Sequence, residues 1–185
     1  VSLEANFTVT EAKKGEYVVL AAQVGVPKGF TLYSMTKIPD GPLPLVINVT
    51  DPALEPAGPW IGPSPNVKMD EGFEKEVEYH TSFASFKRNY KVLSKPRGDS
   101  IDIFLRGQIC DDRSCYNQSI RTKAELELLE GEPRKKHQKP AELEGVVFQA
   151  DRKVGEGTQD AQPNDPSKLG LVAFILMAML AGLGA

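Results

Sequence analysis

The sequence has a two-residue period over Ile101-Asp102-Ile103-Phe104-Leu105-Arg106, in which the two isoleucines and the leucine share one face. Side chains alternate between the two faces of a β-strand, so this period predicts a strand with one buried face. The strand leads into Cys110-Asp111-Asp112-Arg113-Ser114-Cys115-Tyr116, which holds the only two cysteines of the chain. The four residues between the cysteines are polar, so we expect an exposed turn there.

Other segments of the first 129 residues also favour strands. They are residues 16–26, 30–34, 45–49, 74–79, 83–93 and 119–128. The last of these is also compatible with a helix. Seven or eight short strands separated by proline and glycine turns predict an all-β sandwich.

Three further segments have a different composition. Residues 52–65 hold several prolines and glycines around Trp60, which predicts an irregular surface excursion rather than a strand. Residues 130–168 begin with a basic, proline-bounded stretch and end with almost no apolar residue, which favours a flexible tether. Within this tether, residues 144–154 could form one extra strand or dock on the sandwich.

The final segment, residues 169–185, consists only of apolar residues and glycine. A helix that spans a bilayer needs about 20 such residues. We therefore expect the beginning of a transmembrane helix, cut short where the sequence stops. A buried core helix is the alternative, but the segment offers no polar face to solvent. The expected organisation is a sandwich over 1–129, a linker over 130–168 and a truncated transmembrane helix over 169–185.

Composition excludes several classes of function. A net charge of −3 and the absence of a basic, aromatic-rich pattern argue against nucleic-acid binding. Two cysteines and two distant histidines do not make a convincing zinc site. The sequence has no phosphate-binding or dinucleotide-binding glycine loop and no nucleophile-elbow motif, so we expect neither a cofactor nor a metal.

The close spacing of the cysteines suggests redox chemistry. A disulfide that closes so short a loop stabilises a fold by only about 2 kcal/mol, so its purpose could be exchange rather than stability. Thiol–disulfide exchange needs an accessible sulfur and a second cysteine that resolves the mixed disulfide. Asp111 and Asp112 would raise the pKa values of the neighbouring thiols and Arg113 would lower them. A purely structural staple of a β-hairpin remains the alternative.

The order of three motifs resembles a known family. Gly29-Phe30-Thr31-Leu32-Tyr33, Gly41-Pro42-Leu43-Pro44 and the cysteine motif above occur as in the N-terminal periplasmic domain of DsbD-type thiol:disulfide interchange proteins, which are protein-disulfide reductases. The apolar stretch 171–182 looks like the start of the first transmembrane helix of that family. One departure is Tyr116-Asn117-Gln118, where family members often have prolines. Another is a shorter spacing between the cysteines.

The resemblance implies an immunoglobulin-like domain on the periplasmic side of a bacterial inner membrane. Its cysteine pair would relay electrons from the transmembrane and thioredoxin-like domains of its own parent chain to thioredoxin-like periplasmic proteins, including those of cytochrome c biogenesis. Cys115 would react first and Cys110 would resolve.

In the family a cap loop shields the pair. Here Asp70, Glu71 and Phe73 match that cap, with Phe73 the candidate lid, and Tyr33 and Tyr116 are candidate walls of the active site.

Two other functions remain open at this stage. The first is a non-redox, membrane-anchored β-sandwich that binds a partner through its loops, with Trp60 in the binding surface and a structural disulfide. The second is a lipid-anchored surface protein, suggested by three sequons, at Asn6, Asn48 and Asn117.

Overall fold

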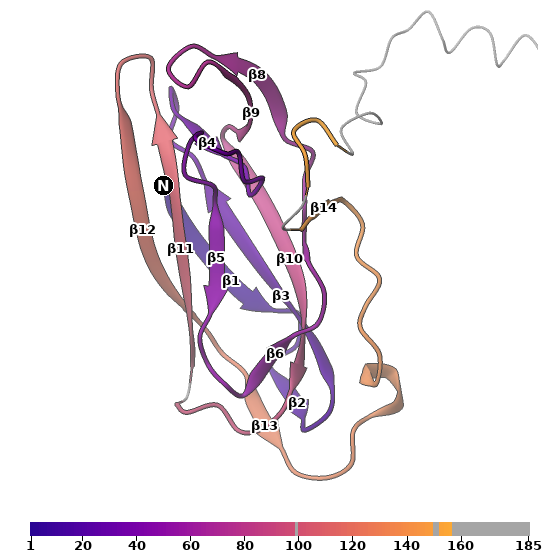
Figure 1. The fold of residues 1–185 in the computed structure, drawn as a ribbon. Coiled ribbons are helices and arrows are strands. Elements are labelled where there is room, and N and C mark those ends of the chain that lie inside the picture. The colour runs from indigo at the N-terminus through magenta and orange to yellow at the C-terminus, as the bar shows by residue number, and fades with distance from the viewer. Residues whose placement is uncertain (99, 150–151, 157–185) are drawn as a thin grey trace, which may run out of the picture.

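Two β-sheets pack face to face in the computed structural model, which describes residues 1–98, 100–149 and 152–156 (Figure 1). The first sheet has the order β1-β3-β10-β7-β14, and β6 also pairs with β10. Its strands are β1 (Ser2–Phe7), β3 (Tyr17–Gly25), β6 (Leu54–Pro56), β7 (Trp60–Gly62), β10 (Phe83–Val92) and β14 (Val146–Phe148).

The second sheet has the order β12-β11-β4-β9-β8, and β5 also pairs with β11. Its strands are β4 (Thr31–Tyr33), β5 (Val46–Val49), β8 (Asn66–Asp70), β9 (Lys75–His80), β11 (Ile101–Cys110) and β12 (Cys115–Ala124). A small parallel pair of β2 (Glu11–Lys13) and β13 (Glu127–Leu129) lies at one end of the sandwich, and the opposite end carries the β11–β12 turn (Figure 1).

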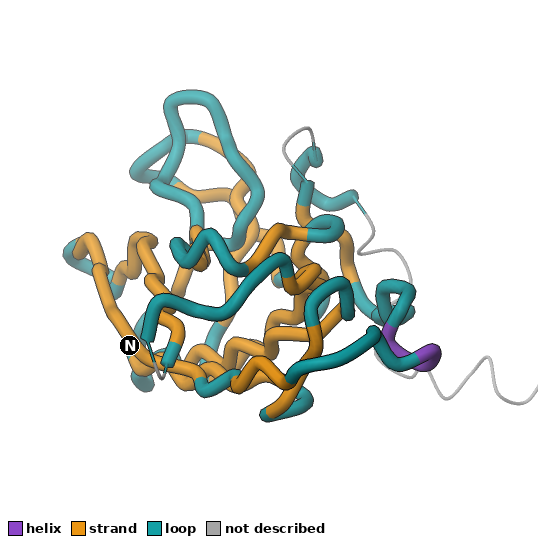
Figure 2. The backbone as a smooth tube through the Cα atoms, turned by 90° about the horizontal axis from the view of Figure 1, so that it is seen from below, coloured by secondary structure: helices purple, strands orange, loops and turns teal. Residues whose placement is uncertain are grey.

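The core forms between the two sheets because apolar residues alternate along the central strands. On β11, Ile101, Ile103 and Leu105 are fully buried, as the two-residue period predicts. From the facing sheet, Leu20 and Phe86 reach the same core and are also inaccessible to solvent. The expectation of an all-β sandwich is confirmed. Figure 2 shows the same strand-rich body along its long axis, with the short 3₁₀ helix η1 (Lys135–His137) at its edge.

Most of the predicted strands are present, and the segment 119–128 is divided between the end of β12 and the start of β13 rather than forming a helix. The prediction for residues 52–65 was wrong, because β6 and β7 lie there and pair with β10. Trp60 is only 6% exposed, and its indole Nε1 donates a hydrogen bond to the carbonyl of Ile47 at 3.2 Å. Trp60 is therefore a core residue that joins the two sheets, and it cannot serve as a binding surface.

The described part of the predicted tether packs against the sandwich. Asn89 exchanges two hydrogen bonds of 2.9 Å with the backbone of Ala141, and β14 pairs with β7 in the first sheet. Phe148 of β14 stacks edge-on against Phe86, and Gly62 makes room for both rings, since a Cβ there would lie 2.5 Å from Phe86. The alternative of an extra docked strand within residues 144–154 is thus the observed one.

No helix among the described residues is both long and apolar enough to cross a membrane. The predicted transmembrane segment, residues 169–185, lies outside those residues. Its nature and the boundaries of the expected domains stay predictions.

An ion pair between the buried Glu16 and the partly exposed Arg134 ties the start of this packed segment to the end of the sandwich that carries β2 and β13. Glu16 is inaccessible to solvent, and its carboxylate accepts hydrogen bonds from the backbone N–H of Arg134 at 2.6 Å and from its Nε at 2.8 Å. The backbone N–H of Lys13 donates a further bond at 3.0 Å. Hydrogen bonds from the Arg134 guanidinium are the largest cause that lowers the pKa of Glu16 to about 2.

This pKa predicts a specific response to acid. Because the pKa of Glu16 is lower in the folded chain than in the unfolded one, the carboxylate stabilises the fold fully above about pH 4.5, and this contribution is lost as the pH falls toward about 2. We expect Glu16→Gln to flatten this part of the curve of unfolding free energy against pH. Urea unfolding at a series of pH values between about 5 and 2 measures it, and equal slopes for both proteins would refute the assignment.

Candidate functional site: the cysteine hairpin and its cap

A disulfide joins Cys110, the last residue of β11, to Cys115, the first residue of β12. The two residues face each other in the antiparallel ladder, so the bond closes the end of a long hairpin. The two sulfur-bearing residues differ in environment. Cys110 is only 6% exposed and packs beneath its neighbours, whereas Cys115 is exposed to solvent. An attacking thiolate therefore meets the Cys115 side of the bond first.

The turn between the cysteines is held together by its own hydrogen bonds. The side chain of Asp111 accepts bonds from the backbone N–H groups of Arg113 at 2.8 Å and Ser114 at 2.7 Å. The backbone N–H of Asp111 donates to the carbonyl of Ser114 at 3.0 Å. The N–H of Arg113 is the main cause that lowers the pKa of the Asp111 carboxyl. These hydrogen bonds close the turn in addition to the disulfide.

A second hairpin, made by β8 and β9, stands beside the cysteines, and we call it the cap hairpin (residues 66–80). An open cleft separates the two hairpins. Residues 68–72 line one side of it, and residues 110–115 line the other, with Tyr33 at its base. Glu71, Asp112 and Arg113 are exposed in this cleft. Figure 1 shows the two hairpins at the same end of the sandwich.

Asp70 holds the cap hairpin to the wall of the cleft. One oxygen of its carboxylate accepts bonds from the backbone N–H groups of Gly72 at 3.1 Å and Phe73 at 3.3 Å, which shapes the turn. The other oxygen accepts the hydroxyl of Tyr33 at 2.8 Å. Burial, helped by the adjacent carboxylate, raises the pKa of Tyr33 well above its usual value, so the phenol stays a hydrogen-bond donor.

Tyr33 and Phe73 cover Cys110. The two rings meet edge to face with centroids 6.0 Å apart. Tyr33 belongs to a small apolar cluster with Val77 and Cys110, and Phe73 and Ile38 pack against this cluster. Phe73 thus lies one ring removed from the buried cysteine, and its role as a lid stays a prediction.

Phe73 does not line the cleft, and neither does the second predicted wall residue, Tyr116. Its side chain is 49% exposed, and its ring contacts Phe30 at a centroid distance of 6.2 Å. Sequence reasoning missed Thr31, which is adjacent to Cys110 in the sheet and whose hydroxyl donates to the Cys110 carbonyl at 3.3 Å. It also missed Ile38 and Val77. Strand register across the sheet brings these residues to the cysteines, and one sequence alone does not reveal it.

The Tyr33 hydroxyl gives a testable stability prediction. Tyr33→Phe removes a largely shielded hydrogen bond to a carboxylate, and we expect a loss of about 2 kcal/mol in the free energy of unfolding. Urea denaturation measures the loss. Tyr116→Phe is the matched control, because its exposed side chain predicts a change within about 0.5 kcal/mol. Equal losses for the two variants would show that the bond between Tyr33 and Asp70 does not support the cap.

The described residues include no group of three or more histidine, cysteine, aspartate or glutamate side chains that could hold a metal ion. No protein-family model and no curated protein sequence matches this chain.

Solved structures of similar shape do exist. The N-terminal domain of DsbD from Neisseria meningitidis, in the reduced form, is 17% identical over 63% of this chain and 80% of that one, with a TM-score of 0.33. The collagen-binding domain of a Staphylococcus aureus adhesin is 4% identical over 66% of this chain and 95% of that one, with a TM-score of 0.36. AggA, a fimbrial major subunit from Escherichia coli, is 10% identical over 70% of this chain and 97% of that one, with a TM-score of 0.31. At such low values no functional conclusion follows from these likenesses.

Proposed function

We propose that the described domain is a thiol–disulfide exchange module whose working group is the Cys110–Cys115 disulfide. The observation that carries the proposal is the asymmetry of the pair: Cys115 is exposed beside an open cleft, and Cys110 is buried beneath Tyr33. Exchange requires an accessible sulfur to be attacked and a partner sulfur held close enough to resolve the intermediate. Both requirements are met by two cysteines on facing positions of one hairpin.

The reaction balances as a transfer of two electrons. A thiolate of a partner dithiol attacks the sulfur of Cys115, the bond to Cys110 breaks, and Cys110 leaves as a thiolate that takes up a proton. The second thiolate of the partner then attacks the mixed disulfide and releases Cys115. The partner ends as a disulfide and this chain as a dithiol. The reverse sequence passes the electrons to the disulfide of a second protein.

The alternative is a sandwich that binds partners and uses the disulfide only as a staple. Two observations weigh against it. The side chain of Asp111 accepts hydrogen bonds from the backbone N–H groups of Arg113 and Ser114, so the disulfide is not the only bond that closes the turn. Trp60, the aromatic residue expected in a binding surface, is buried in the core.

The family resemblance of the sequence extends the proposal to partners and location. On that resemblance the electron donors are the thioredoxin-like and transmembrane domains of the parent chain, and the acceptors are thioredoxin-like proteins of the bacterial periplasm. The domain would face the periplasm from the inner membrane, anchored through residues 169–185. The sharp division of the sequence between a polar stretch and an apolar terminal run supports the anchor.

Exchange with a reduced thioredoxin tests the proposal. The full oxidised chain is mixed with the reduced protein, quenched with acid at intervals and alkylated with a reagent that shifts mobility on a gel. We expect one thioredoxin to be oxidised for each chain reduced, faster than with dithiothreitol at the same thiol concentration. A disulfide that persists in a large excess of reduced thioredoxin would overturn the proposal.

A further inference from the structure

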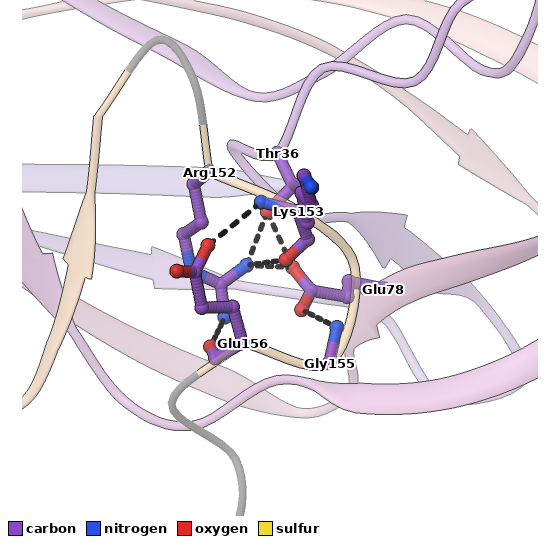
Figure 3. Close-up of polar contacts among 6 residues, drawn as sticks. All are labelled: Thr36, Glu78, Arg152, Lys153, Gly155 and Glu156. Atoms are coloured by element: carbon purple, nitrogen blue, oxygen red, sulfur yellow. Dashed lines mark hydrogen bonds and ion pairs between the residues drawn. The ribbon is translucent and has the colours of Figure 1, made fainter.

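A buried polar cluster joins the last described residues of the chain to the cap hairpin. Glu78 of β9 is 1% exposed and Arg152 is 5% exposed, and the two form an ion pair (Figure 3). Thr36 lies between them: its hydroxyl donates to the carboxylate of Glu78 and accepts from Arg152 Nη1 at 2.5 Å. We call Glu78, Thr36, Arg152 and the turn of residues 152–156 the latch.

The turn of residues 152–156 wraps around the carboxylate of Glu78. The backbone N–H of Gly155 donates to Glu78 at 2.8 Å, which satisfies the oxygen that Arg152 does not contact. Arg152 in turn donates to the carbonyl of Glu156, and its guanidinium lies 5.0 Å from the centre of the Phe148 ring. Within the part of the chain that the structure describes, Arg152 is the only positively charged side chain in contact with the buried carboxylate of Glu78.

The latch connects to the cysteines through two short paths. On β9, Glu78 follows Val77, which packs against Cys110 and Tyr33. On the other side, Thr36 belongs to the loop after β4, in which Ile38 packs against the same cluster. A backbone hydrogen bond of 2.8 Å from Ser34 to the carbonyl of Glu78 holds the two paths together.

Without Arg152, the carboxylate of Glu78 would be left buried without its counter-charge, which a fold tolerates poorly. The carboxylate regains hydration at the lowest cost in free energy if β9 and the loop that carries Thr36 loosen and expose Glu78. Those are the elements that support Tyr33 over Cys110. Local opening of this kind changes the reactivity of a buried group without unfolding the whole domain.

We propose that Arg152 and Glu78 are positioning residues that keep the wall over Cys110 closed. Attack on the exposed Cys115 expels Cys110 as a thiolate, and a closed wall shields that thiolate from water, so the C-terminal turn sets how fast the disulfide is reduced. This inference concerns the release of the buried Cys110 sulfur and does not depend on any partner protein. Displacement of residues 152–156 from the sandwich would open the site, whereas their docking would protect it.

The test compares two arginine–glutamate pairs with buried carboxylates at opposite ends of the sandwich. In the full chain, Arg152→Gln is expected to speed reduction of the disulfide by dithiothreitol about tenfold. The substitution lowers the free energy of local opening around Cys110, so the open state is more populated. Arg134→Gln breaks the pair with Glu16 at the end that carries β2 and β13, and is expected to leave the reduction rate unchanged.

Two further measurements separate positioning from a general loss of stability. Hydrogen exchange should rise in residues 66–80 and in the loop after β4 for Arg152→Gln but not for Arg134→Gln. Arg152→Lys keeps the charge but cannot make all the contacts of the guanidinium, so it should accelerate reduction less than Arg152→Gln but still measurably, and it serves as the test variant if Arg152→Gln does not fold. Equal acceleration by the variants at both ends, or no acceleration by either Arg152 variant, would overturn the proposal.

Discussion

Replacement of Cys110 by serine should leave Cys115 as an exposed thiol that captures partners, whereas replacement of Cys115 should leave a thiol that hardly reacts. The difference follows from exposure, since Cys115 is open to solvent and Cys110 lies beneath Tyr33 and Phe73. We expect Cys110→Ser to react with an activated disulfide at least about tenfold faster than Cys115→Ser. The rate of release of the coloured thiol from the reagent measures this difference.

The same pair of variants tests the order of the exchange steps. Cys110→Ser lacks the resolving cysteine, so a mixed disulfide with thioredoxin should accumulate on Cys115 and be visible on a non-reducing gel. Cys115→Ser should give no such complex. A complex formed mainly by Cys115→Ser would reverse the assigned roles. Circular dichroism of both variants checks that each retains the sandwich.

The second large effect concerns Trp60. Truncation to alanine removes a buried ring that packs edge-on against Tyr90, with ring centroids 6.5 Å apart. It also removes the hydrogen bond that the indole N–H donates to the carbonyl of Ile47. We expect a loss of about 3–5 kcal/mol in the free energy of unfolding. Urea denaturation followed by circular dichroism measures it.

Leu43→Ala is the matched control, because Leu43 is 51% exposed and its truncation should change stability by less than about 0.5 kcal/mol. If Trp60→Ala were as stable as the unmodified protein, Trp60 would not be a core residue, and the binding-module interpretation would be open again.

The sequence predicts the sandwich where the hydrophobic period is strong. β11 shows it, because Ile101, Ile103 and Leu105 point into the core while the residues between them lie on the opposite face. β1 follows the same period, but the small Ala5 at its centre weakens the pattern, and the prediction missed it. β8 has an exposed or half-exposed face throughout, so no apolar period marks it.

The buried charges are beyond reach of a single sequence. Arg134 lies 118 residues from Glu16, and Arg152 lies 74 residues from Glu78. A single charged residue in a polar stretch predicts a solvated side chain. Only the folded structure shows that it forms an ion pair with a buried carboxylate. For this reason the sequence predicts a flexible tether over residues 130–168, whereas the described part of that segment is held to the sandwich at Arg134 and at Arg152.

The candidate site was predictable in its chemistry but not in its geometry. The spacing of the cysteines predicted the hairpin turn, and the family resemblance pointed to Tyr33, Asp70 and Phe73. Their mutual contacts depend on pairing between β4, β9 and β8, which local sequence does not specify. Tyr116 shows the limit of the approach, since it is adjacent to Cys115 in the chain but contacts Phe30 away from the cleft.

If the Cys110–Cys115 disulfide takes part in thiol–disulfide exchange, the reduction potential of this cysteine pair tests that role most directly. The full chain is equilibrated against glutathione and thioredoxin redox buffers, quenched and alkylated to give the fraction reduced. Our account predicts a potential between about −180 and −270 mV, the range of proteins that exchange disulfides. A potential well below about −300 mV would mark the bond as a structural staple and contradict the account.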